Sequence, residues 1–183
     1  MEELSKIKIS EKYTRREILD RFLELDEDLC KLKLADFDNI AAFPATFVLG
    51  MYREMEKIIG KAAKGLVIRS ARLSAKKYAE KLKGLGGDPM FTVINYLTLW
   101  SALGWGRAKL EREEKRIRLI LDYTFEGKNY KELFGKSDEP MCWIAFGFVW
   151  GLLESALDKE IRGEEKECFA KGDNRCVFEF EWD

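Results

Sequence analysis

The chain has 183 residues, and 46% of them are hydrophobic, enough for one domain with a single core. Its net charge of −1 excludes a general binder of nucleic acids or anionic membranes. No signal peptide opens the sequence, and no apolar run reaches the roughly 18 residues of a membrane span. We therefore predict a cytoplasmic protein without a membrane span.

The chain has four cysteines and no histidine, and its charged residues, 36% of the total, are weighted to Lys and Glu. It also lacks glutamine. This bias is typical of hyperthermophile proteins, which is why we expect a thermophilic source. In a chain without export signals, cysteines indicate metal binding or free thiols, but intracellular disulfides do occur in hyperthermophiles. Composition leaves both alternatives open.

Residues 1–39 predict an N-terminal helical arm. Thr14 and Glu17 form a capping box, and apolar residues follow at three- and four-residue spacing over residues 14–32. Cys30 lies beside this stripe and is interpreted as a small buried hydrophobe. Because the arm and the apolar segment 40–43 need a covering surface, we predict a homodimer built through residues 1–60.

Residues 40–183 are predicted to form one domain that opens with helices. Apolar periodicity indicates helices from residue 46 to 59, up to residue 83, and from residue 89 to 103, the last with Asp88 as N-cap and Pro89 in its first turn. The second of them is rich in Lys and Arg. With a balanced net charge we interpret this basic face as solvated, not as a patch for nucleic acid or another anion.

The second half of the domain changes from helical to alternating patterns. Strands are predicted at 105–111, 115–125, 160–169 and 175–182, with residues 126–129 as the turn that ends the second. A strongly apolar helix is predicted at about 140–157, between the two strand pairs. The predicted fold class is α+β, with a four-stranded antiparallel sheet packed against a bundle of about five helices. The inward positions of the second strand are Ile117, Leu119, Leu121, Tyr123 and Phe125.

The last two strands read as a hairpin closed by a three-residue loop centred on Gly172, across which Cys168 would face Cys176. In the final strand the alternation places one set of side chains in the core and Val177, Glu179 and Glu181 on the opposite face. The buried set is Cys176, Phe178, Phe180 and Trp182.

Three of the cysteines and one carboxylate form a candidate metal site. Three sulfurs and one carboxylate oxygen make the four ligands that a tetrahedral zinc ion requires. A Cys168–Cys176 disulfide or simply buried thiols are the alternatives on composition alone. The candidate ligands are Cys142, Glu165, Cys168 and Cys176.

The spacing Glu165-x2-Cys168-x7-Cys176, followed by Val177 and Phe178, resembles the C-terminal signature of the 4-vinyl-reductase domain family. The resemblance extends back to about residue 40. It implies a Zn²⁺ ion held by Cys142 together with the three hairpin residues. It also implies a superfamily shared with vesicle-trafficking tethers and haem-based nitric-oxide sensors, whose usual role is to enclose an apolar small molecule. The phenol-sensing members use a histidine that this chain lacks.

From the residues alone, the rings of helix 140–157 and of the sheet favour a packed core. The family resemblance instead implies a ligand cavity between that helix and the sheet, beside Gly147 and Gly151. Phe146, one turn after Cys142, is the position that the family pattern assigns to an aromatic residue. The candidate lining residues are Phe91, Tyr96, Trp100, Trp105, Phe146 and Trp150.

These observations predict a zinc-stabilised sensor or carrier domain for an aromatic or lipid-like ligand, and not an enzyme. The sequence shows no phosphate-binding loop and no pair of nucleophile and base, and four protein ligands would leave no open position on zinc. Two alternatives stay open. One is a reductase of vinyl-tetrapyrrole-like substrates, which the family name suggests, and the other is a ligand-free scaffold of the trafficking type.

Overall fold

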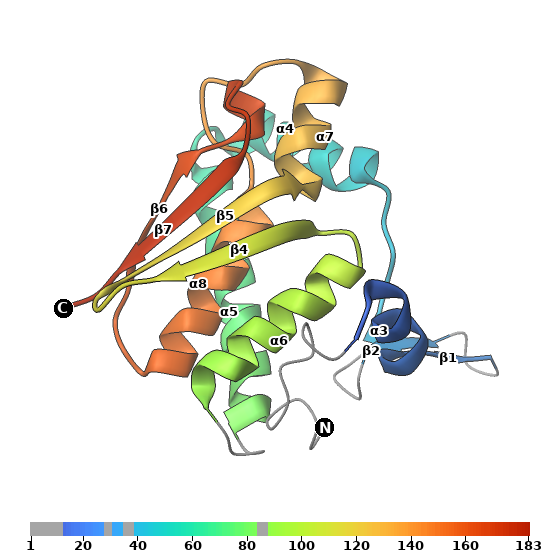
Figure 1. The fold of residues 1–183 in the computed structure, drawn as a ribbon. Helices are drawn as coiled ribbons and strands as arrows, with labels where there is room; N and C mark the ends of the chain where they lie inside the picture. Colours follow the sequence, from blue (N-terminus) through green and yellow to red (C-terminus); the bar gives the residue numbers. More distant parts are fainter. Residues whose placement is uncertain (1–12, 28–30, 35–38, 84–87) are drawn as a thin grey trace.

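The computed structural model describes residues 13–27, 31–34, 39–83 and 88–183. Within this part of the chain, six α-helices accompany a four-stranded antiparallel sheet, and a small three-stranded sheet lies near the N-terminus (Figure 1). The predicted α+β class is confirmed. Among the described residues, no helix combines the length and the apolarity that crossing a membrane requires.

The four-stranded sheet is made of the four strands expected from alternation. These are β4 (Gly106–Arg112), β5 (Arg116–Thr124), β6 (Arg162–Glu167) and β7 (Cys176–Glu181), in the order β4-β5-β7-β6. The core side chains of β7 are buried as predicted, but Val177 is buried as well, because β7 is an inner strand of the sheet. The predicted position of Val177 on a solvent face was wrong.

A β-bulge changes the alternation at the end of β5. Arg107 pairs with Tyr123 and Ala108 with Leu121, so that Asp122 is an extra residue in β5. The insertion turns Tyr123 outward, where it is 37% exposed. The inward position predicted for Tyr123 was therefore wrong.

Residues 125–134 form a helix that the sequence analysis missed. Helix α7 (Phe125–Phe134) begins directly after β5, and the Thr124 side chain caps it by accepting a hydrogen bond from the backbone N–H of Gly127. Gly135, with φ of +84°, ends it. Phe125 is thus the first residue of a helix, not the last inward residue of a strand.

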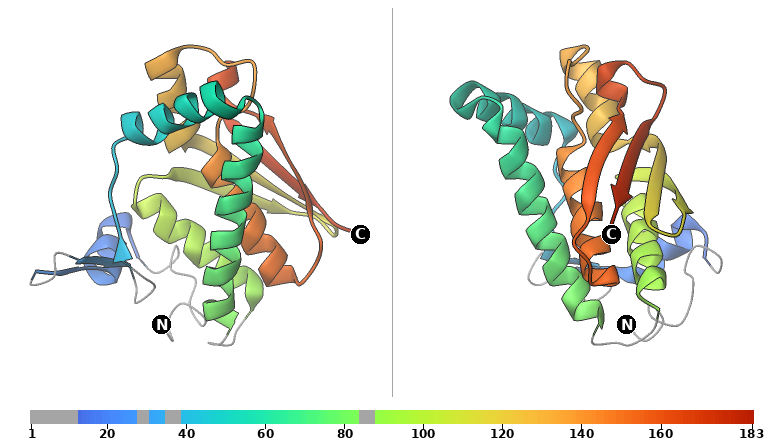
Figure 2. Two further views of the ribbon diagram at one scale, coloured as in Figure 1. Left: turned by 180° about the vertical axis from the view of Figure 1, so that it is seen from behind. Right: turned by 90° about the vertical axis from the view of Figure 1, so that its left-hand side faces the viewer.

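Helix α8 (Trp143–Leu157) lies at the centre of the molecule. The sheet covers one side of it, and α5 (Ala62–Lys83) and α6 (Pro89–Ala102) pack on others (Figure 2). Its two internal glycines face the backbone of α5: a methyl group at Gly147 would collide with the carbonyl of Ile68, and one at Gly151 with that of Arg72. The glycines thus allow close packing of two helices, and they do not line a cavity.

Because Gly151 has no room for a side chain, Gly151→Ala should destabilise the protein by about 3 kcal/mol or more, through separation of α5 from α8. The matched control is Gly65→Ala within α5, where a Cβ would meet nothing within 4 Å. There the higher helix propensity of alanine should raise stability by about 0.5–1 kcal/mol. Urea denaturation of both variants measures the difference, and equal effects would contradict the packing.

The N-terminal arm is only partly helical. The capping box of Thr14 and Glu17 is confirmed at the start of α3 (Arg15–Phe22), but the predicted continuation to residue 32 is wrong. The chain instead forms β1 (Leu23–Asp26), β2 (Lys31–Leu34) and β3 (Asn39–Ile40). Cys30 lies outside the described residues. After β3, Pro44 is the N-cap of α4 (Ala45–Ile59), which confirms the helix expected there.

Candidate metal centre and aromatic pocket

The four predicted ligands meet in one buried cluster. Cys142 is the N-cap residue of α8, Glu165 lies in β6, Cys168 follows β6, and Cys176 begins β7. Their donor atoms all lie within 4.8 Å of one another, so the cluster could hold a metal ion.

The distances between sulfur atoms suit a metal better than a disulfide. The sulfur of Cys142 lies 3.8 Å from that of Cys168 and 3.4 Å from that of Cys176. A disulfide requires about 2.05 Å, whereas tetrahedral zinc with bonds of about 2.3 Å separates two sulfurs by about 3.8 Å. All three thiols are free, so the Cys168–Cys176 disulfide left open by composition does not form here.

The connection between β6 and β7 is longer than the predicted three-residue loop. Strand pairing ends at Glu167, opposite Val177, and a 3₁₀ turn (Phe169–Lys171) follows before Gly172, whose φ is +103°. The left-handed conformation at Gly172 is the part of the prediction that agrees with a tight reversal. The 3₁₀ turn lets Cys168 and Cys176 share one site without being partners across the ladder.

Hydrogen-bond donors surround the sulfur atoms. The backbone N–H groups of Met141 and Phe169 donate to the sulfurs of Cys168 and Cys176, at 3.4 and 3.3 Å. Such donors stabilise negative charge on sulfur and orient the ligands of a metal.

The carboxylate of Glu165 supplies an independent sign of a missing cation. Its Oε1 atom is buried and has no hydrogen-bond partner among the described residues. A buried carboxylate oxygen without a partner is unfavourable, and a cation held by the neighbouring sulfurs would satisfy it. The residues present therefore fit a metal ion.

The electrostatics of the cluster agree with this fit. Burial raises the pKa of Glu165, and the nearby Cys168 raises it further. Burial also raises the pKa of the Cys142 thiol. Burial acts in the same direction on Cys176, but hydrogen bonds from the Cys142 and Cys168 thiols lower its pKa to about 5. Ionised ligands are thus costly here without a positive charge at the centre.

A second buried carboxylate, missed by the sequence analysis, lies beside the cluster. Glu126 accepts hydrogen bonds from the backbone N–H groups of Ile144 and Ala145, at 2.9 and 2.7 Å, and from the hydroxyl of Tyr52 on α4. It is fully buried, and burial raises its pKa to about 7 although these hydrogen bonds lower it. Its position in the first turn of α7 was the available signal, but α7 itself was not predicted.

An aromatic pocket of about 500 Å³ opens between α4, α6 and α8. The Trp100 ring stacks on Trp105 with centroids 4.6 Å apart and lies 4.2 Å from the Phe148 ring. Tyr96 stacks on Phe148 at 5.1 Å. We call this the aromatic pocket. Its lining residues are Leu32, Ile40, Ala41, Ala42, Phe43, Phe47, Val48, Met51, Tyr78, Tyr96, Trp100, Leu103, Gly104, Trp105, Phe125, Ile144 and Phe148.

Three of the six ligand-binding candidates line this pocket, namely Tyr96, Trp100 and Trp105. Phe91, which is 38% exposed, does not line it, and neither do Phe146 and Trp150.

Rings occupy the interface between α8 and the sheet, where the sequence analysis expected the cavity. Phe146 stacks on Phe180 and meets the edges of Phe178 and Trp150, with each pair of ring centroids 5.4 Å apart. The Trp150 indole N–H donates to the carbonyl of Ile161. The aromatic pocket lies on another side of α8, because the two glycines face α5 and leave no space beside the sheet.

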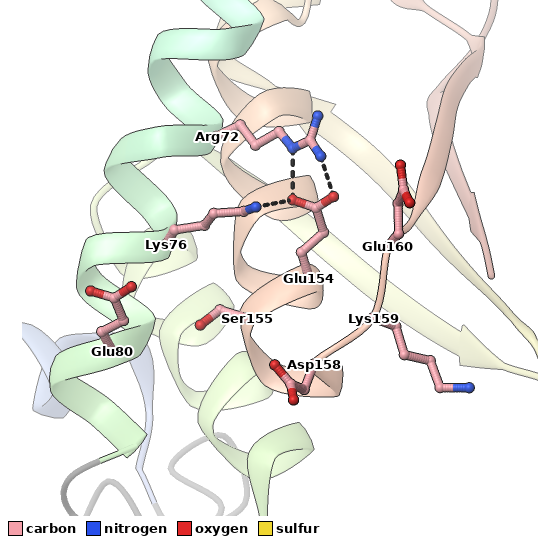
Figure 3. Close-up of a pocket in the computed structure, with 8 residues that line it drawn as sticks. All are labelled: Arg72, Lys76, Glu80, Glu154, Ser155, Asp158, Lys159 and Glu160. Atoms are coloured by element: carbon pink, nitrogen blue, oxygen red, sulfur yellow. Dashed lines mark hydrogen bonds and ion pairs between the residues drawn. The ribbon is translucent and has the colours of Figure 1, made fainter. Parts of the chain in front are cut away.

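A polar pocket of about 540 Å³ lies between α5 and the end of α8 (Figure 3). Its centre is Glu154, whose side chain is 4% exposed and which pairs with Arg72 and Lys76 of the basic helix. The Arg72 guanidinium also lies over the Trp150 ring, 4.6 Å from its centroid. These two cations of α5 thus have a structural partner, which supports the interpretation of its charge as balanced within the protein.

The Glu154 pairs make stability depend on pH. Burial raises the pKa of Glu154, but hydrogen bonds from Arg72 and Lys76 outweigh it and hold the pKa below its usual value of 4.5. A depressed carboxyl pKa stabilises the fold above the unfolded pKa, and this contribution disappears as the pH falls through the folded pKa. Glu154→Gln should therefore cost about 1–3 kcal/mol at pH 7, since both cations are partly exposed. The cost should shrink below about pH 4.5.

Thermal unfolding between pH 3 and 7 measures the effect. The control is Asp122→Asn, which removes an ion pair with Arg107 in which both side chains are more than half exposed. It should cost less than about 1 kcal/mol at every pH. A Glu154→Gln variant as stable as the wild type at pH 7 would refute the role of these pairs.

Comparison with known proteins agrees with the fold and with the ligand cluster. Residues 121–182 match the model of the 4-vinyl-reductase domain family. A 53-residue segment is 34% identical to the phenol regulator MopR of Acinetobacter guillouiae, and it covers 29% of this chain but only 10% of that regulator. The structure of the phenol-responsive sensory domain of the transcription activator PoxR, solved with phenol, superposes with a TM-score of 0.78. That match has 20% identity and covers 92% of this chain and 90% of the other.

A vinyl-4-reductase family protein of Methanocaldococcus jannaschii superposes with a TM-score of 0.56 at 16% identity, over 79% of this chain and 84% of the other. At these identities the structural matches establish the fold alone. The family match covers α7, α8 and all four ligands of the cluster, and it confirms the resemblance drawn from the spacing of those ligands: the chain carries a 4-vinyl-reductase domain in residues 121–182.

Proposed function

We propose that this chain is a metal-stabilised sensor or carrier domain that encloses an apolar small molecule in the aromatic pocket. The observation that carries the proposal is the pocket itself. Its volume of about 500 Å³ lies within the range of roughly 300–1,000 Å³ of small-molecule sites. No charged side chain is among its lining residues, so a neutral ligand fits it better than an ion.

The rings of the pocket favour a flat ligand with a hydrogen-bond acceptor. Trp100 and Trp105 present stacking faces, and their indole N–H groups can only donate. The phenol-binding PoxR domain and the phenol regulator MopR support a small-molecule role for the same fold. Because this chain has no histidine, we expect its preference to differ from that of sensors that use one.

We propose Zn²⁺ as the metal, held by Cys142, Glu165, Cys168 and Cys176. Three thiolates and one carboxylate are ligands that zinc accepts in tetrahedral geometry. The ion would supply a structural cross-link between α8 and the strands β6 and β7. Four protein ligands leave no position for a reactive water, which favours a structural site over a catalytic one.

We propose a binding role without catalysis, and three measurements separate it from its rivals. Native mass spectrometry of gently purified protein should show a mass in excess of one chain and one metal ion. Protein without an extra mass, together with no binding of N-phenyl-1-naphthylamine, a neutral fluorescent aromatic probe, would favour the scaffold alternative. Oxidation of NADPH in the presence of a vinyl-porphyrin would favour the reductase.

We also propose a homodimer formed through residues 1–60, with residues 1–39 as the dimerisation arm of the domain 40–183. Large apolar side chains on α4 and before it support this proposal, since Phe43, Phe47 and Ile58 are 57%, 55% and 78% exposed. Contiguous exposed apolar surface of this kind often marks an interface. Light scattering at micromolar concentration should give twice the chain mass, and a monomer would refute the proposal.

A further inference from the structure

The segment 124–127, between β5 and α7, contacts the metal cluster with both of its ends. The hydroxyl oxygen of Thr124 lies 3.4 Å from the sulfur of Cys142 and 3.4 Å from that of Cys176. Gly127 packs on the same two sulfurs so closely that a Cβ there would lie 3.0 and 3.1 Å from them. Two of the four candidate ligands therefore rest on this segment.

The middle of the same segment forms part of the aromatic pocket. Phe125 lines the pocket, its ring centroid lies 5.1 Å from that of Trp105, and its backbone N–H donates to the Trp105 carbonyl at 2.9 Å. Glu126 accepts the backbone N–H of Ile144, another lining residue. It also accepts the hydroxyl of Tyr52, which is the neighbour in sequence of a further lining residue, Met51.

Glu126 thus joins three walls of the pocket. One wall comes from α4, a second from the start of α7, and a third from the first turn of α8, directly after Cys142. Because the Glu126 carboxylate is fully buried, its hydrogen bonds are costly to break. A shift at the sulfurs is therefore transmitted to the pocket walls and is not absorbed locally.

We infer that residues 124–127 couple the metal centre to the aromatic pocket, so that the affinity for a neutral aromatic ligand depends on metal occupancy. The inference rests on the proposed function and adds to it. A metal that draws Cys142 and Cys176 to fixed positions also fixes Thr124 and Gly127, and through them Phe125 and the Glu126 hydrogen bonds. Since coupling between two sites is reciprocal, a bound ligand must retain the metal more tightly by the same factor.

The test compares the affinity for N-phenyl-1-naphthylamine in zinc-loaded and chelator-treated protein. For the wild type we expect Kd to rise about tenfold on metal removal, within the usual range of coupling between sites. Thr124→Val keeps the shape of the side chain but removes its hydroxyl contacts with both sulfurs and with the Gly127 N–H. In this variant the ratio of the two Kd values should fall below about threefold, with the metal content unchanged.

Lys128→Ala, an exposed position on the same helix, is the matched control and should keep the wild-type ratio. Equal Kd values for the wild type with and without metal would overturn the coupling alone. An undiminished ratio in Thr124→Val would likewise overturn it. Failure of the probe to bind either form would remove the pocket, and with it both the proposed function and the coupling.

If the metal-free protein unfolds, the reciprocal measurement decides the matter. The release of Co²⁺ can be followed by its thiolate absorption, with and without saturating N-phenyl-1-naphthylamine. The probe should slow release from the wild type and from Lys128→Ala, and slow it less from Thr124→Val. Equal slowing in all three proteins would mean that the probe only stabilises the folded state as a whole, which would overturn the role of the segment.

Discussion

Cys142→Ser should abolish stoichiometric metal binding and lower the melting temperature by about 8–16 °C. A metal present at a thousandfold excess over its Kd stabilises the folded state by about 4 kcal/mol. For a chain of this length, each kcal/mol corresponds to about 2–4 °C. The loss is large because Cys142 is fully buried at the start of the central helix and is the one cluster ligand on α8. Elemental analysis and calorimetry measure the two effects.

Two controls separate the metal from the serine itself. After chelation the wild type and Cys142→Ser should unfold at similar temperatures, because both then lack the metal. Cys30→Ser should leave the metal content unchanged. Since thiolates must be ionised to bind, the affinity should also fall as the pH drops, with uptake of protons on release. Native protein that contains no metal would refute the centre.

Phe146→Ala and Trp100→Ala should have opposite profiles. Phe146 is 4% exposed and packs on three rings of the core, so its loss should cost about 3–5 kcal/mol of stability. Binding of N-phenyl-1-naphthylamine should hardly change in that variant, because Phe146 does not line the aromatic pocket. Trp100→Ala should weaken the probe more than about tenfold, through loss of a stacking ring.

Trp100 is only partly buried, so its replacement should destabilise the fold less than that of Phe146. Denaturation curves and probe titrations on the same two proteins give all four values. A Phe146→Ala variant of near wild-type stability and altered probe affinity would restore the cavity between α8 and the sheet. Unchanged probe binding in Trp100→Ala would contradict the aromatic pocket.

The features predicted from sequence are those encoded by local patterns. Alternation over a few residues identified the strands that contain Ile117 and Phe178, because side chains in a strand face opposite sides in turn. The convergence of the four ligands was predicted as well. That prediction needed the family resemblance, since the spacing of Glu165, Cys168 and Cys176 does not by itself place Cys142 beside them.

The features that were missed depend on contacts between distant segments. Leu25 and Leu32 fit a helical stripe, yet they pair across two strands, because extended chain can also place them on one side. Helix α7 was missed because its cap, Thr124, is also the last residue of an alternating strand. The place of the pocket depends on which helix faces Gly147 and Gly151, and sequence spacing does not specify that partner.

The close packing of α5 on α8 also decides which part of the chain can be moved as a unit. The family match begins at residue 121, but α8 within it is buried partly by the backbone of Ile68 and Arg72, well upstream of that start. A fragment cut at the family boundary would expose an apolar helix along its whole length to water and to other copies of itself. Any chimaera that borrows the metal-binding segment therefore has to carry α5 with it, with small side chains retained where the two backbones touch.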